Sequence, residues 1–360
     1  MKRNISYCQD YLARNTLQSV YTDVYSGTRP TSCDFMLTAP KSNITKAKRK
    51  EIPVFFAADN NYLPFLDVTL LSVKEHASKN YIYKIYVLHS GINGKKAEEI
   101  MRHACEDFQI AFVNVEEYLQ DVQQYFRLRD YYTSAIYYRL FIVGMFPNLD
   151  KALYLDCDIV ALSDVAELYN TELGSAYVGA VADQVVGAEP IFKDYTKRAL
   201  GVDGEKYFNS GVITLNLKQL RKINFYEKFY AMLKSYDFRV APDQDCLNVL
   251  CKGRVRYFSE VWNRMPQAVA EQSGAPEPKL IHYNLSKKPW HYTDVPYQDH
   301  FWKYAKQSAF YKEILHHLNS FTKDKAEKDM QAGKALLQLA KTEAESEQNY
   351  YSLYLKKVSK

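Results

Sequence analysis

The sequence has few cysteines, and no two of them stand in a C-x-x-C pair. There are six cysteines among 360 residues, so neither a disulfide framework nor a redox dithiol motif is expected, which favours a reducing compartment. Cys157 is expected to point into the core. Cys246 and Cys251, close together on a predicted helix, are expected to be buried free thiols.

Long apolar runs are also missing. No stretch approaches the roughly 18 apolar residues that a membrane-spanning helix needs. Residues 1–7 are basic and are not followed by an apolar stretch, so no signal peptide is expected. Together with the cysteine pattern, these absences predict a cytoplasmic protein.

Neither sign of charge dominates. The formal net charge of +5 is small for this length and does not resemble the basic surface of a nucleic-acid-binding protein, so no nucleic-acid partner is expected. With 47% hydrophobic and 25% charged residues, the composition is that of an ordinary globular protein. Tyrosine, however, is abundant at 31 residues. Its amphipathic ring suits carbohydrate faces and membrane interfaces as well as ordinary cores.

The chain divides into three segments. Residues 1–50 are predicted to be a polar N-terminal extension, partly helical over residues 11–25, whose basic end is interpreted as a solvated linker; a membrane or partner contact is the alternative. Residues 51–303 are predicted to be the main α/β domain, and residues 304–360 a helical C-terminal extension.

Strand-like apolar runs alternate with helical spacing in the main domain, which predicts an α/β fold with parallel strand pairs and right-handed crossovers. Strands are predicted at 53–58, 82–88, 110–115, 152–155, 177–182, 211–216 and 255–258. Helices are predicted at 63–76, 95–108, 137–145, 223–234, 244–251, 301–318 and 322–357.

The most informative motif is a pair of carboxylates, Asp156 and Asp158, that follows an apolar run. Residues i and i+2 of an extended strand point to the same side, and burying two such charges together is unfavourable. A divalent cation with oxygen ligands would offset them. The spacing alone leaves a second interpretation open, in which the acids face water or pair with Arg or Lys.

Polar residues also follow other predicted strands. Asp59 and Asn61 follow the first strand, and Asp183 follows the strand at 177–182. Open α/β sheets bind ligands beyond the carboxyl ends of their strands, so these groups are expected to converge with the carboxylate pair at one edge. Each of them alone is also an ordinary turn residue.

Later motifs add further polar groups. Asn209 offers an amide to a sugar hydroxyl, and Gly211 leaves room for a close backbone approach. Asp243 is predicted to cap a helix. His282 is a candidate third metal ligand, although a lone histidine is more often a satisfied polar residue. Lys288 is a candidate partner for a phosphate.

Together these motifs resemble glycosyltransferase family 8. The resemblance covers about residues 52–303, with the segments AADNNY, YLDCD, FNSGV, DQD and HY…KPW in the family's order. It implies the GT-A fold, a Rossmann-like nucleotide-diphosphosugar transferase fold with a mixed central sheet, here carrying helical N- and C-terminal extensions.

The resemblance also implies an activity. Members are retaining, metal-dependent hexosyltransferases, so the expectation is transfer of glucose or galactose from a UDP-sugar to a hydroxyl of a glycan, glycolipid or glycoprotein acceptor, as in the synthesis of lipopolysaccharide and other cell-surface glycans. Mn²⁺ or Mg²⁺ would be the cofactor. No carboxylate is an obvious nucleophile, which favours a front-face displacement over a covalent intermediate. The alternatives are a catalytically weak UDP-sugar-binding protein and a self-glycosylating primer, which the abundant tyrosines would suit.

The family's site residues carry over to matching positions of this sequence. The implied metal ligands are Asp156, Asp158 and His282. The implied donor-binding residues are Ala57, Asp59, Asn61, Tyr62 (stacked on the base), Arg139, Asp156, Asn209 and Lys288. The implied catalytic residues are Gln244, beneath the anomeric carbon, together with Asp183 and Asp243.

The sequence departs from the family pattern at Leu285, where the family has a glycine whose amide lies near the diphosphate. The leucine side chain is expected to push the loop back or alter its turn, and so to weaken the grip on the donor.

The C-terminal end combines aromatic residues with lysines. This pattern is consistent with a peripheral contact on the inner face of a membrane, with packing on the main domain, or with a homodimer helix.

Overall fold

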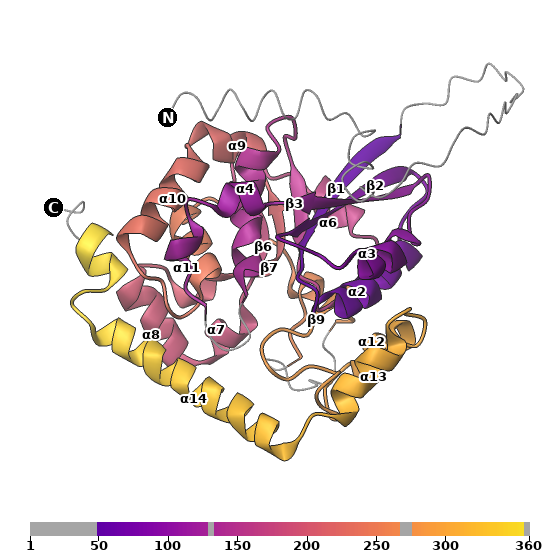
Figure 1. Ribbon diagram of the computed structural model, residues 1–360. Coiled ribbons are helices and arrows are strands. Elements are labelled where there is room, and N and C mark those ends of the chain that lie inside the picture. The colour runs from indigo at the N-terminus through magenta and orange to yellow at the C-terminus, as the bar shows by residue number, and fades with distance from the viewer. Residues whose placement is uncertain (1–48, 129–132, 267–275, 356–360) are drawn as a thin grey trace, which may run out of the picture.

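The computed structural model describes residues 49–128, 133–266 and 276–355 (Figure 1). A seven-stranded sheet runs through the molecule in the order β3-β2-β1-β4-β7-β6-β8, and a two-stranded sheet pairs β5 with β9. The strands are β1 Lys50–Ala57, β2 Tyr81–His89, β3 Phe108–Asn114, β4 Ala152–Leu155, β5 Ile159–Ala161, β6 Val178–Ala182, β7 Phe208–Leu215, β8 Val255–Tyr257 and β9 Leu280–His282. The predicted N-terminal extension lies outside the described residues, except for Arg49 and Lys50 at its end.

The seven-stranded sheet is mixed, as the family resemblance implied. β1 pairs in parallel with β2 and β4, β2 with β3, and β6 with β8. β7, however, runs antiparallel to both of its neighbours, β4 and β6, so the prediction of parallel pairing from the alternating pattern is wrong at this strand. Every residue of β7 is buried, and a strand buried on both faces has the same continuous apolar pattern in either direction.

Helices cover both faces of the sheet (Figure 1). The α-helices are α2 Leu63–Glu75, α3 Gly94–Met101, α4 Glu116–Leu119, α5 Ile142–Met145, α6 Ala166–Asn170, α7 Gln184–Ala188, α8 Pro190–Ala199, α9 Leu217–Lys222, α10 Phe225–Ser235, α11 Pro242–Leu250, α12 Gln298–Ala305, α13 Tyr311–Asn319 and α14 Lys323–Glu345. Short 3₁₀ helices are η1 Gln123–Tyr125, η2 Ser134–Phe141, η3 Gly204–Lys206 and η4 Glu260–Trp262, and η5 Tyr351–Leu355 is a turn of π-helix.

Several predicted elements differ from those observed. The helix predicted at 95–108 ends at Met101, and Phe108 already begins β3. The helix predicted at 137–145 is the 3₁₀ helix η2 followed by one turn of α-helix. The helix predicted at 301–318 is two helices, α12 and α13, and α14 ends at Glu345, well before residue 357. β5 and β9, three residues each, were not predicted.

The two faces of the sheet form two hydrophobic clusters. Alternate strand residues enter opposite clusters, as the pleat requires: Phe55 and Tyr154 face the cluster that includes α10 and α11, whereas Val54 and Leu153 face the cluster that includes α2 and α12. Burial of both faces explains why the strands are continuous apolar runs in the sequence. The expected burial of the three thiols Cys157, Cys246 and Cys251 is confirmed.

The C-terminal helices pack on the main domain. Ser308, between α12 and α13, donates a hydrogen bond of 2.6 Å to the buried Asp67 of α2. α14 runs from α13 to α8 and packs against α8 (Figure 1). The domain boundary predicted after residue 303 falls inside α12 and stays a prediction. Among the helices that the structure describes, none is both long and apolar enough to cross a bilayer.

Candidate active site

The polar groups singled out in the sequence meet at one edge of the sheet. The carboxyl ends of β1, β4 and β6 point to this edge, and the reversed direction of β7 brings its amino end there as well. A cavity at this edge is lined by nearly all of the predicted site residues: Ala57, Asp59, Tyr62, Arg139, Asp156, Asp158, Asp183, Asn209, Asp243, Gln244, His282 and Lys288. Asn61 is the exception. It is exposed and does not belong to the cavity lining.

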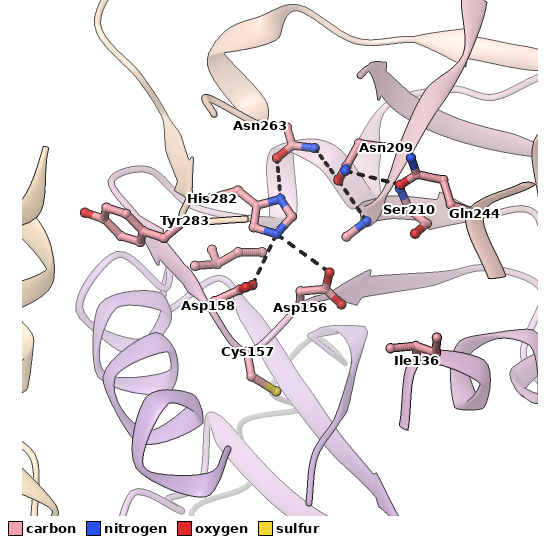
Figure 2. A network of polar contacts seen from close by, with 12 residues as sticks. Ile136, Asp156, Cys157, Asp158, Asn209, Ser210, Gln244, Asn263, His282 and Tyr283 are labelled. Atoms are coloured by element: carbon pink, nitrogen blue, oxygen red, sulfur yellow. Dashed lines mark hydrogen bonds and ion pairs between the residues drawn. The ribbon is translucent and has the colours of Figure 1, made fainter. Parts of the chain in front are cut away.

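Asp156, Asp158 and His282 lie together in the cavity (Figure 2). The two acids follow β4, and the chain then continues into β5, where Ile159 pairs with His282 of β9. His282 Nε2 lies 3.1 Å from Asp158 Oδ1 and 3.7 Å from Asp156 Oδ2. One ligand atom from each residue falls within 4.8 Å of the others, which is compact enough for all three to bind one ion.

The other ring nitrogen of His282 identifies its tautomer. Nδ1 lies 2.9 Å from Asn263 Oδ1, and the amide of Asn263 is oriented by a 3.0 Å bond from its Nδ2 to Asn209 Oδ1 (Figure 2). Because an amide oxygen only accepts, Nδ1 carries a proton, so in the neutral ring the lone pair of Nε2 faces the two acids. An imidazole held in this way is the usual arrangement of a metal-binding histidine.

Asp158 provides the second sign of a cation site. Its Oδ1 is buried and has no hydrogen-bond partner among the described residues. An anionic oxygen thus lies close to His282 Nε2, and this contact is favourable only when a proton or a metal ion on that nitrogen supplies positive charge. Carboxylate oxygens and one imidazole suit Mn²⁺, so the residues present fit the divalent metal that the sequence predicted.

The backbone of Gly211 closes one side of this centre. Its carbonyl accepts a 2.8 Å hydrogen bond from the backbone N–H of Asp156. A Cβ atom added to Gly211 would lie 2.4 Å from Asp156 Oδ2 and 2.4 Å from the Cε1 atom of His282. The close backbone approach expected here is confirmed, and only glycine leaves room for both ligands.

Lys288 pairs with Asp158. Its Nζ contacts Asp158 Oδ2 and donates a 2.5 Å hydrogen bond to the carbonyl of Tyr283. Burial by itself would raise the pKa of the Asp158 carboxyl, but the nearby Lys288 ammonium outweighs burial and holds that pKa below its usual value. The acid therefore stays ionised. Trp290 anchors this loop by stacking on Phe65 with ring centres 3.8 Å apart.

Arg139 is buried beneath Asp156. Its Nη2 donates a 2.8 Å bond to Asp156 Oδ1, and its Nη1 donates to the carbonyl and hydroxyl oxygens of Ser210 at 2.7 and 3.0 Å. The hydroxyl of Tyr154 donates to the same Oδ1 at 2.9 Å. These bonds leave Oδ2 to face His282, so Arg139 orients a metal ligand. Its predicted contact with the donor stays a prediction.

Asp183, Asn209 and Gln244 form a hydrogen-bonded triangle beside the metal centre. Asp183 Oδ2 accepts from Asn209 Nδ2 at 3.0 Å and from Gln244 Nε2 at 3.1 Å. Gln244 Oε1 accepts from the backbone N–H of Ser210 at 2.8 Å. The three side chains thus hold one another in position next to the metal centre. Their contact with the donor sugar stays a prediction.

Asp243 does not cap its helix, so that prediction is wrong. α11 begins at Pro242, a residue favoured at the first helical position, and the capping position falls to Ala241. Asp243 instead lies in the first turn, where its Oδ2 accepts from Ser210 Oγ at 3.1 Å and lies 3.3 Å from Arg139 Nε. Burial raises the pKa of its carboxyl. Asp183, in contrast, does cap a helix, at the start of α7.

The predicted nucleotide end of the cavity begins where β1 ends. Asp59 Oδ1 accepts hydrogen bonds from the backbone N–H groups of Asn61 and Tyr62 at 2.9 and 3.0 Å, which shapes the turn into α2. Ala57, Asp59 and Tyr62 line the cavity here. Their contacts with a nucleotide stay predictions.

Leu285 stands where the family pattern has glycine. Its φ of 58° lies in the left-handed region, which is disfavoured for residues with a Cβ atom. The leucine therefore occupies a backbone conformation that favours glycine, and its side chain lines the cavity. Its expected effect on the grip on the donor stays a prediction.

Sequence reasoning missed Asn263, which orients His282. It lies in an irregular segment after η4 and belongs to no motif, so only its position in space identifies it.

Comparisons with known proteins agree with this geometry. Residues 53–294 match the family model described as glycosyl transferase family 8. A putative glycosyltransferase of Haemophilus influenzae is 28% identical over 218 residues, 59% of this chain and 63% of that protein. The lipopolysaccharide 1,2-glucosyltransferase of Escherichia coli K12 is 28% identical over 277 residues, 72% of this chain and 79% of that protein. The chain thus spans less than two thirds of the length of the Haemophilus relative.

Two solved structures share the fold. The WbbM bifunctional glycosyltransferase superposes with a TM-score of 0.66 at 25% identity, over 78% of this chain and 53% of that one. The galactosyltransferase LgtC, solved with donor and acceptor sugar analogues, superposes with a TM-score of 0.56 at 25% identity, over 72% of this chain and 96% of that one. The expected GT-A fold is confirmed. The chain belongs to glycosyltransferase family 8.

Proposed function

We propose that this protein transfers a hexosyl group, glucose or galactose, from a UDP-sugar to a hydroxyl of a glycan, glycolipid or glycoprotein acceptor with retention of the anomeric configuration. The observation that carries the proposal is the buried contact of 3.1 Å between Asp158 Oδ1, which has no hydrogen-bond partner among the described residues, and His282 Nε2. This cation site adjoins the Asp183–Asn209–Gln244 triangle. The relatives that transfer glucose or galactose support a hexose as the donor sugar.

Asp156 Oδ2, Asp158 Oδ1 and His282 Nε2 would hold Mn²⁺ or Mg²⁺. When bound, the ion supplies positive charge to the leaving diphosphate. Lys288, whose ammonium already lies at this centre, is positioned to add a second positive charge to a phosphate. Arg139 and Tyr154 hold Asp156 in the orientation that this arrangement needs.

The transfer forms a bond between the acceptor hydroxyl oxygen and the anomeric carbon. The bond from that carbon to the phosphate oxygen breaks, and its electron pair leaves with the diphosphate. The hydroxyl proton passes to a phosphate oxygen of the leaving group on the same face of the sugar. Gln244, fixed by Ser210 and Asp183, would lie beneath the anomeric carbon and stabilise its developing positive charge.

The carboxylate of Asp183 supports a front-face displacement. Both oxygens of Asp183 accept hydrogen bonds, Oδ1 from the backbone of α7 and Oδ2 from Asn209 and Gln244. A nucleophile that forms a covalent intermediate needs a free oxygen, so Asp183 is not poised for that role. Asp243 is engaged through Oδ2, by Arg139 and Ser210.

The direct test is release of UDP from UDP-glucose and UDP-galactose in the presence of Mn²⁺, with Asp158→Asn as the inactive control. We expect wild-type turnover that stops when a chelator is added, and little turnover by the variant. Undiminished turnover in the presence of the chelator would remove the metal from the mechanism.

Leu285 gives weight to one alternative, a catalytically weak UDP-sugar-binding protein, because its side chain lies in the cavity where the family has glycine. UDP binding without turnover would support it. A self-glycosylating primer would show hexose on its own tyrosines by mass spectrometry. The cytoplasmic location, a peripheral membrane contact and a homodimer through the C-terminal helices stay predictions.

A further inference from the structure

The cavity has a second wall of different chemistry from the metal centre. Five apolar residues from separate parts of the chain line it and belong to the hydrophobic cluster on the α11 side of the sheet: Ile136, Val186, Phe192, Val240 and Leu336. At the nucleotide end, Ala58, Tyr62 and Cys157 belong to the opposite cluster, while Ala57 packs against the same cluster as the apolar wall. Most of the apolar lining at the two ends of the cavity therefore comes from opposite faces of the sheet.

This wall begins beside the predicted sugar position. The backbone N–H of Val186 donates to Asp183 Oδ1 at 3.0 Å, and the carbonyl of Ile136 accepts from Arg139 Nε at 3.0 Å. A molecule that presents a hydroxyl to a sugar held by Asp183 would thus have its remaining atoms against Val186 and its apolar neighbours.

Two tyrosines that line the cavity have hydroxyl groups that are already hydrogen-bonded within the protein. The hydroxyls of Tyr195 and Tyr207 each donate to Asp245 at 2.7 Å, and Asp245 is fully buried in α11, outside the cavity lining. With their hydroxyls committed to Asp245, these rings add carbon surface to the wall. A sugar ring needs partners for its hydroxyls, whereas an alkyl chain gains free energy from such a surface.

α14 completes the wall from outside the residues that match the family model, which end at 294. Near its start, Asp329 Oδ2 accepts a 2.9 Å bond from Tyr292. Near its end, the buried Glu343 accepts a 3.0 Å bond from Tyr236. At 1.5 Å per residue, these anchors are about 21 Å apart, and Leu336 reaches the cavity between them.

A row of apolar or small residues on α14 leads from the cavity toward the start of the helix. Met330, Gly333 and Leu336 follow one another at intervals of three residues, a spacing that places successive residues side by side on a helix. Met330 is 55% exposed. A Cβ atom added to Gly333 would meet no atom within 4 Å. Open space therefore lies beside the helix between an exposed methionine and the cavity.

We propose that α14 forms a subsite for the alkyl chain of an amphiphilic acceptor, whose sugar headgroup offers its hydroxyl at the metal centre while its chain lies against Leu336 and leaves along Gly333 and Met330. This inference rests on the proposed function for its headgroup position, and it selects a glycolipid among the acceptors considered above.

The test compares octyl and methyl glycosides of glucose and of galactose, below micellar concentration, on the full chain with Mn²⁺ and UDP. Saturation-transfer NMR detects alkyl protons in contact with the protein and does not require turnover. We expect strong transfer to the octyl chain in the wild type and its loss in Leu336→Gln. Leu337→Gln is the matched control, because Leu337 is adjacent on the same helix and does not line the cavity. Leu336→Met, which keeps an apolar side chain, should behave as wild type.

The expected effect on affinity follows from burial of the chain against one leucine. We expect the octyl glycoside to bind about tenfold more tightly than the methyl glycoside in the wild type, and this preference to fall several-fold in Leu336→Gln. Equal binding of the two glycosides, or equal octyl signals in Leu336→Gln and Leu337→Gln, would overturn the proposal. A third outcome separates the two proposals. If Leu336→Gln loses the octyl contact but the wild-type protein never releases UDP from a donor, the alkyl subsite is supported and the transferase function is overturned.

Discussion

His282 Nε2 lies 3.1 Å from Asp158 Oδ1, a buried oxygen with no hydrogen-bond partner among the described residues. On the other side of the ring, Nδ1 donates a hydrogen bond to Asn263 Oδ1. In the neutral ring the lone pair of Nε2 therefore faces a carboxylate oxygen, and a cation held between the two atoms would relieve their repulsion.

Asn263→Ala should weaken Mn²⁺ binding by about ten- to a hundredfold, because the imidazole loses the partner that holds its tautomer and orientation. Electron paramagnetic resonance of free Mn²⁺ in a titration with UDP present measures the affinity. Asn263→Asp keeps an acceptor for Nδ1 and should bind the ion more tightly than the alanine variant. Unchanged affinity in Asn263→Ala would show that Asn263 does not orient the ligand.

Gly211→Ala should abolish metal binding while the protein remains folded. The added Cβ atom would stand 2.4 Å from both Asp156 Oδ2 and the His282 ring, so at least one ligand must move. The same Mn²⁺ titration measures the loss. Gly94→Ala is the control, since a Cβ atom there meets nothing within 4 Å, and wild-type affinity in Gly211→Ala would contradict the proposed ligand set.

Leu285→Gly should be more stable than Leu285→Ala by about 1 kcal/mol, because both variants remove the side chain but only glycine adopts a φ of 58° without strain. Urea unfolding of the two variants measures the difference. Equal stabilities would mean that the turn relaxes in the alanine variant. Leu285→Gly also restores the residue of the family pattern, so we expect tighter UDP binding than in the wild type, measured by calorimetry.

Asp245→Asn should flatten the pH dependence of stability on the acidic side of neutrality. Burial raises the pKa of Asp245 to about 7, above the value of about 3.9 expected in the unfolded chain. Between these two values the folded state holds the extra proton, so this carboxyl makes the free energy of unfolding fall as pH rises towards 7.

The effect of Asp245 reaches at most about 1.4 kcal/mol per pH unit within that window. Urea unfolding of the wild type and the asparagine variant at several pH values isolates this contribution. Parallel pH profiles for the two proteins would show that Asp245 titrates in its ordinary range.

Most of the strands and the principal site residues could be predicted from the sequence. The apolar runs at 53–58 and 152–155 correspond to β1 and β4, because burial of both strand faces produces continuous apolar runs. The acids that follow these strands reach one cavity, because parallel strands end at the same edge of a sheet. The helix predicted at 95–108 was too long, since helical spacing does not mark where a helix gives way to a strand.

What remained beyond sequence reasoning depends on contacts between distant residues. The direction of β7 leaves no local pattern, yet it brings Asn209 and Gly211 to the cavity. Asn263 belongs to no motif, and no local pattern of α14 places Leu336 in the site, although it lines the cavity.

The sequence by itself determined the α/β class, the family and the acids at the strand ends, because these depend on residue type and on spacing over a few positions. Only the tertiary structure decided the tautomer of His282, the pairing of Lys288 with Asp158 and the apolar wall completed by α14. Each of these depends on groups far apart in the chain, and their distances and burial are set by how the whole chain packs.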